Sequence, residues 1–101
     1  VNTNGESRLV TPGRFWHAHA RPDGKFIVAD DFDGRLWLVQ TATGSVRLLA
    51  TGLRDRVGDP KGVHLHPAYD WQGRYLVFNV TKNYRAVGII DLDELPAQTW
   101  R

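Results

Sequence analysis

With 101 residues, a net charge of +2 and 42% apolar residues, the chain is at most one domain with a modest core. Acidic and basic residues are interspersed, which argues against nucleic-acid binding, and no apolar run reaches the roughly 20 residues of a membrane span. The absence of cysteine excludes disulfides and thiolate metal sites, and we expect a soluble protein of the cytoplasm or periplasm.

Short apolar runs separated by Gly, Asp, Asn and Pro recur about every ten residues without a helical period, which predicts an all-β fold. Tight turns are expected at the dipeptides Asp23-Gly24, Asp33-Gly34 and Thr43-Gly44. The predicted strands cover residues 7–11, 15–20, 25–30, 35–40, 45–50, 62–67, 74–80 and 86–91. A polar loop is expected over 51–61 and a loose tail over 93–101.

The sequence repeats itself at an offset of 49 residues. The offset aligns Gly13 with Gly62, His17 with His66, Gly24 with Gly73, and residues 26–28 with 75–77. Two residues inserted in the next turn bring 36–39 over 87–90, and the opening residues 8–13 match 47–52. A four-strand unit repeated at just under fifty residues is typical of a β-propeller blade.

The repeat predicts a single partial β-propeller domain of about two four-stranded antiparallel blades. Residues 1–13 would be the outer strand of a preceding blade, 14–52 a complete blade, 61–92 a blade lacking its outer strand, and 93–101 a tail. Two blades cannot close a propeller, which typically takes four to eight. The chain is therefore a portion of a larger propeller, several copies that close a ring, or another all-β fold with a duplication; the absence of methionine, also at position 1, favours the first.

All four histidines lie in two places, His17 with His19 and His64 with His66. Residues two apart on a strand face the same side, roughly 6.6 Å apart, so each pair can direct its imidazoles toward one point. We therefore predict a metal site from His64, His66, His17 and His19. Three imidazoles with an oxygen ligand suit Mn, Fe, Ni or Zn, whereas the alternative is that the histidines are structural.

The run from His66 to Asn79, with its forerunner from His17 to Asp30, resembles the blades of oligogalacturonate lyase and related TolB-like propellers. The resemblance covers about residues 7–92 and implies a seven-bladed lyase that holds Mn with three histidines and a glutamine. Such enzymes cleave acidic oligosaccharides, the oligogalacturonates, by β-elimination. By resemblance His64 and His66 are the paired ligands, and the third is His17 or, failing it, His19.

The sequence departs from this family at the fourth ligand, because Lys61 stands where the family has its glutamine. Lys61 would instead bind a substrate carboxylate as a point charge, or be a solvated loop residue. The catalytic base of the family, a histidine helped by an arginine, belongs to an earlier blade. We therefore expect the catalytic residues outside this chain, and the chain alone to be inactive.

Two other interpretations remain open. A TolB-type or WD-type propeller that only binds partners would use the histidines structurally and hold no metal. A small cupin is the rival fold, since Gly58, His64, His66 and Asp70 superficially follow the cupin metal motif. However, no histidine follows residue 66 to complete a cupin site, and the duplication has no place in that fold.

Overall fold

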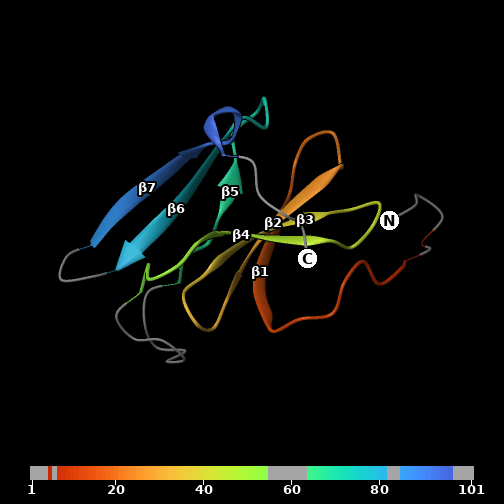
Figure 1. Ribbon diagram of the computed structural model, residues 1–101, viewed down its shortest axis with the longest axis horizontal. Coiled ribbons are helices and arrows are strands. Elements are labelled where there is room, and N and C mark those ends of the chain that lie inside the picture. The colour runs from red at the N-terminus through yellow and green to blue at the C-terminus, as the bar shows by residue number, and fades with distance from the viewer. Residues whose placement is uncertain (1–4, 6, 55–63, 82–84, 97–101) are drawn as a thin grey trace.

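Two antiparallel β-sheets make up the computed structural model of the protein, which describes residues 5, 7–54, 64–81 and 85–96 (Figure 1). The first sheet contains, in spatial order, β1 (Phe15–Ala20), β2 (Phe26–Asp31), β3 (Leu36–Gln40) and β4 (Val46–Ala50). The second contains β5 (Ala68–Tyr69), β6 (Tyr75–Thr81) and β7 (Arg85–Asp91), which the 3-10 turn η1 (Leu92–Glu94) follows. The all-β prediction is confirmed, and neither sheet is closed within these ranges. No helix in the described part is long and apolar enough to cross a membrane.

The hairpins of the four-stranded sheet turn at the three predicted dipeptides. Gly24, Gly34 and Gly44 have φ angles of 72°, 74° and 74°, in the left-handed region that only glycine enters without strain. Asp31 organises the second of these turns, because its carboxylate accepts hydrogen bonds from the backbone N–H groups of Asp33 (2.9 Å) and Arg35 (3.1 Å). The residue types at this turn therefore set the register of the hairpin formed by β2 and β3.

A β-bulge interrupts the pairing of β1 with β2. Phe15 pairs with Asp31 and Ala18 with Ala29, so β1 holds one residue more than β2 between these two pairs. His17 lies in this bulge. Its backbone N–H donates to the side chain of Asp30 at 2.6 Å, which places His17 and Asp30 against each other.

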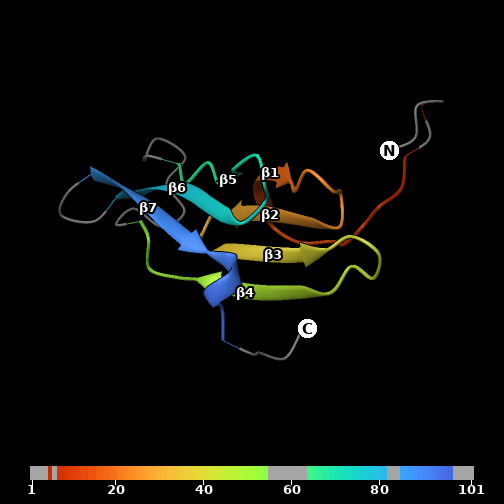
Figure 2. The ribbon, with the colours of Figure 1, turned by 90° about the horizontal axis from the view of Figure 1, so that it is seen from above.

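The hydrophobic core lies between the two sheets, which Figures 1 and 2 show beside each other. One buried cluster contains residues of both sheets: Val28, Leu38, Tyr69 and Leu76. A second cluster joins Leu36 of β3 to Leu65 and Phe78. Each sheet therefore buries one apolar face against the other, as expected for two meanders that carry related sequences.

The segment before β5 differs from the strand predicted over residues 62–67. Residues 62 and 63 lie outside the described ranges, and residues 64–67 form no strand, so that ladder pairing begins only at Ala68. His66 has a φ of 44°, which turns the chain out of the extended conformation, and Pro67 has no N–H to donate to a ladder. A backbone hydrogen bond from Asn79 to the carbonyl of Leu65, at 2.8 Å, still fastens this segment to β6.

Two further expectations concern the ends of the chain. Residues 7–11, predicted as a strand, pair with no other strand among the described residues. They lie against the four-stranded sheet, where Arg8 donates to the carbonyl of Thr41 at 2.9 Å. The predicted loose tail begins with the ordered turn η1, whereas residues 97–101 lie outside the described part.

Candidate metal centre

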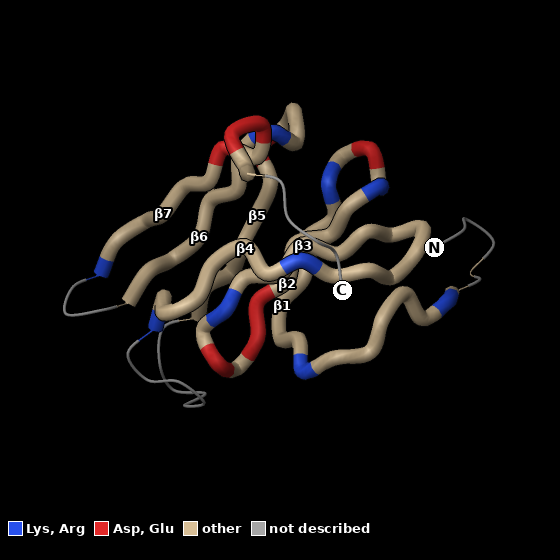
Figure 3. The backbone as a smooth tube through the Cα atoms, viewed as in Figure 1, with Lys and Arg blue, Asp and Glu red and all other residues tan. Residues whose placement is uncertain are grey.

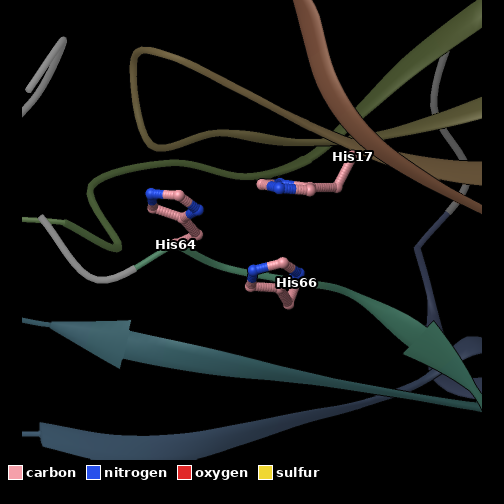
Figure 4. Close-up of side chains that lie close together, drawn as sticks. All are labelled: His17, His64 and His66. Atoms are coloured by element: carbon pink, nitrogen blue, oxygen red, sulfur yellow. The ribbon is translucent and has the colours of Figure 1, made fainter. Parts of the chain in front are cut away.

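Three of the four histidines come together between the two sheets. His17 is contributed by β1, and His64 and His66 by the segment that leads into β5 (Figure 4). One ring nitrogen of each lies within 4.8 Å of a ring nitrogen of the others. The ring centroids of His17 and His66 are 3.9 Å apart, and those of His64 and His66 are 5.4 Å apart. Imidazoles from the two repeats thus converge, as the 49-residue offset predicted.

The alternation of side chains around Leu65 puts the two later histidines on one side. Leu65 is 1% exposed and lies in the core, whereas His64 and His66 lie on the opposite side of the segment. This pattern is the one expected for a strand, although the segment is held by only part of a ladder. The amide of Asn79 helps to hold it, donating from Nδ2 to the carbonyl of His64 at 3.0 Å.

Asp30 connects the two halves of the cluster and is the residue that the sequence did not reveal. Its side chain is fully buried, and its oxygens lie 3.0 and 3.2 Å from Nδ1 of His17. It also accepts the backbone N–H of His17 at 2.6 Å and, more weakly, that of His66 at 3.3 Å. One carboxylate therefore contacts both the strand and the segment that carry the cluster.

The carboxylate also fixes the tautomer of His17. Because an ionised carboxylate only accepts hydrogen bonds, a neutral His17 in this pair carries its proton on Nδ1 and keeps the lone pair on Nε2. A carboxylate that holds one ring nitrogen while the other nitrogen faces a metal is a common arrangement in histidine metal sites. The pairing therefore leaves His17 in the form that a metal ligand requires.

The surroundings of His66, which is exposed, favour the neutral form of its ring. Desolvation lowers the pKa of His66 below its usual value of 6.5, the neighbouring His17 and His64 lower it further, and Asp30 opposes them. A histidine must be neutral to bind a metal ion, so the crowding of three imidazoles favours the ligating form.

Aromatic side chains line one side of the histidine cluster. The indole of Trp16 lies 3.8 Å from the ring of His64 and 4.5 Å from the ring of Phe32, measured between centroids. The guanidinium of Arg54 lies 5.4 Å from the centre of the same indole. Trp16 therefore restricts the orientation of His64, whereas Trp71, which is 96% exposed, is open to solvent.

The two remaining predicted site residues lie elsewhere. Nδ1 of His19 accepts a hydrogen bond from the backbone N–H of Tyr69 at 3.1 Å, which fastens β1 to β5 and keeps His19 out of the cluster. Its two-residue spacing from His17 was the only signal for a ligand, and that spacing does not reveal which partner each ring meets. Lys61 falls outside the described residues.

Comparison with known proteins found no matching family model, no similar curated protein and no similar solved structure. The function of the cluster must therefore be argued from its own chemistry. Ligands about 2.1 Å from one ion lie roughly 3–4 Å apart. Nitrogens already within 4.8 Å need only small rotations of the side chains to share an ion.

Proposed function

We propose that His17, His64 and His66 bind a divalent metal ion in one part of a β-propeller lyase that acts on acidic oligosaccharides. The observation that supports metal binding is the meeting of three imidazoles from two sheets, one of them held by the buried carboxylate of Asp30. The lyase assignment rests on the resemblance of the repeat to oligogalacturonate lyase. The two meanders, which carry the repeated sequence, support the blade assignment.

The donor set suits borderline transition metals. Neutral imidazoles bind Zn, Fe and Ni well, and with added oxygen ligands or water they also bind Mn, which the resemblance favours. A bound divalent ion would neutralise the carboxylate of a uronate and so stabilise the enolate that forms when the adjacent proton is removed. The residues of this chain supply the ligands and their orientation, and the proton acceptor is expected outside it.

A binding scaffold without catalysis is the second candidate. His19 favours it, since this histidine has a purely structural use in fastening β1 to β5. If the other three histidines had the same kind of use, imidazole contacts would add to the shared hydrophobic core in holding the two sheets together.

Metal binding by single-site variants separates the two candidates. The protein would be stripped with EDTA, and Mn²⁺ and Zn²⁺ titrated by calorimetry against wild type and His17→Ala, His64→Ala and His66→Ala. Each of these variants should bind at least tenfold more weakly, because each removes one of three ligands. His19→Ala is the matched control and should bind like the wild type. Equal affinity in all four variants, or no binding by the wild type, would support the scaffold.

The lyase part of the proposal needs its own assay. Oligogalacturonate would be added to the metal-loaded protein, and the ultraviolet absorbance of the unsaturated product followed. Because the proton acceptor is expected outside this chain, binding of the substrate should be measured as well, by calorimetry with and without metal. Metal-dependent binding of the oligosaccharide supports the assignment. The same affinity with and without metal, or for a neutral oligosaccharide, would contradict it.

A further inference from the structure

An apolar face of the three-stranded sheet remains open to solvent. Val77, Val87 and Ile89 are 40%, 72% and 65% exposed. Val77 pairs directly with Ile89, and Val87 lies two residues before Ile89 on β7, so the three side chains share one face. The opposite face of the same strands carries Leu76 and Phe78 and is buried in the core.

The internal repeat shows what such a face contacts. Val77 corresponds to Val28 at an offset of 49, and Val87 and Ile89 correspond to Leu36 and Leu38 at an offset of 51. These counterparts in the four-stranded sheet are 0%, 0% and 7% exposed, because the three-stranded sheet covers them. The open face is therefore a second copy of a surface that, elsewhere in this chain, is buried under another sheet.

The edge of the same sheet is open as well. β3 is paired on its outer side by β4, whereas β7, the counterpart of β3, has no outer neighbour among the described residues. Figure 3 shows no charged residue along β7 between its two ends, Arg85 and Asp91. Edge strands that remain exposed are usually protected by charges or prolines, so an unprotected edge favours pairing with a further strand.

The segment at residues 8–12 fits this edge by sequence. It corresponds to residues 47–51 of the repeat, most of which form β4, the strand that pairs with β3. It has no strand partner of its own in the described ranges, and Leu9, the counterpart of Leu48, is 80% exposed. Its last two residues, Thr11 and Pro12, line a hollow on the four-stranded sheet together with Trp37 and Val46.

We propose that two copies of this chain associate head to tail, with residues 8–12 of one copy pairing with β7 of the next. The same contact places Val77, Val87 and Ile89 of that next copy against the four-stranded sheet of the first copy, which repeats the contact between the two sheets of one chain. A head-to-tail contact of this kind joins different surfaces, so repeated association gives a ring or an open chain. The association needs no metal, so its test does not involve the proposed metal site.

The register of β3 with β4 specifies the contact. Leu36 pairs with Ala50, and the repeat converts this pair into Val87 and Thr11 of a neighbouring copy. The chain has no cysteine, so each single substitution introduces the only thiol. Chains with Val87→Cys would be mixed with chains with Thr11→Cys under mild oxidation. The control mixture pairs Val87→Cys with Asp23→Cys, which lies in an exposed turn of the four-stranded sheet.

Sedimentation velocity in EDTA, over a range of protein concentrations, measures the association itself. The wild type should increase in mass with concentration, and Ile89→Lys should stay monomeric because it places a charge on the docking face. Trp71→Lys, at an exposed position outside this face, should associate like the wild type. A disulfide-linked species enriched in the Val87 and Thr11 mixture completes the expected result. A wild type that stays monomeric, or equal cross-linking in both mixtures, would overturn the proposal.

Discussion

Replacing Asp30 by asparagine tests whether the buried carboxylate orients a metal ligand or only holds the fold together. The substitution keeps the size of the side chain and one acceptor oxygen. That oxygen can still accept the backbone N–H of His17, whereas the new NH₂ group faces two donors, Nδ1–H of His17 and the N–H of His66. The simplest relief is a change of tautomer, in which Nδ1 of His17 loses its proton and accepts from the amide.

The change of tautomer moves the proton of His17 to Nε2, the nitrogen that would otherwise bind the metal. We therefore expect Asp30→Asn to weaken metal binding by about 10- to 100-fold, the usual effect of removing a carboxylate behind a ligating histidine. Hydrogen bonds to a charged group contribute about 1.5–3 kcal/mol each. Weakening one or two of them should lower the free energy of unfolding by roughly 2–4 kcal/mol, within the 5–15 kcal/mol typical of a domain.

The assay combines calorimetric titration of Zn²⁺ with urea unfolding in EDTA. Asp33→Asn is the matched control, because Asp33 lies three residues away, is 39% exposed and pairs with Arg35 through its side chain. It should leave the affinity for metal unchanged. NMR of the imidazole nitrogens reports the tautomer of His17 directly. A folded Asp30→Asn protein with wild-type affinity, or with the proton still on Nδ1, would refute the reasoning.

Two further predictions concern the second hairpin of the four-stranded sheet. Burial raises the pKa of Asp31, but hydrogen bonds from Trp37 and from its own turn outweigh burial and lower the pKa below 3.8. The contribution of Asp31 to stability is therefore complete above about pH 4, and it is lost as the pH falls through the pKa of the folded state. Asp31→Asn should therefore unfold more easily in urea at neutral pH and lose less stability on acidification, and parallel pH profiles would contradict this. Gly34→Ala should lower the melting temperature more than Gly24→Ala. Both glycines have φ above 70°, but only at Gly34 would the added carbon meet Arg54, at 3.2 Å. Equal shifts of the melting temperature in calorimetry would show that the contact has no effect.

Local patterns in the sequence were sufficient to predict most of the fold. Residue types at the turns, such as Asp33-Gly34, set where the chain reverses, and alternating apolar runs set the strands between the turns. The repeat predicted that His17 and His66 would meet, because equivalent strands of neighbouring sheets place equivalent residues near each other. These features depend on interactions between residues that are close in sequence, or on the duplication itself.

Features that depend on tertiary register were not predictable in this way. The meeting of Asp30 with His17 requires the bulge in β1, and no local pattern signals that extra residue. His19 lies two residues from His17, yet the approach of β5 gives its Nδ1 a backbone partner. The left-handed turn at His66 replaced a predicted strand, since a histidine with positive φ is uncommon and Pro67 alone does not predict it.

The position of the cluster links the proposed metal site to the stability of the whole chain. His17 belongs to the four-stranded sheet, whereas His64 and His66 belong to the segment that β6 fastens to the three-stranded sheet. An ion held by all three would join the two sheets across their shared core, and it would bind only when they are docked. Binding to the docked state alone stabilises it by about 2.7 kcal/mol at a free metal concentration one hundred times Kd. The same core residues that bury the sheets against each other therefore also bring the imidazoles together, so loss of Leu65 or Phe78 would weaken both the fold and the site.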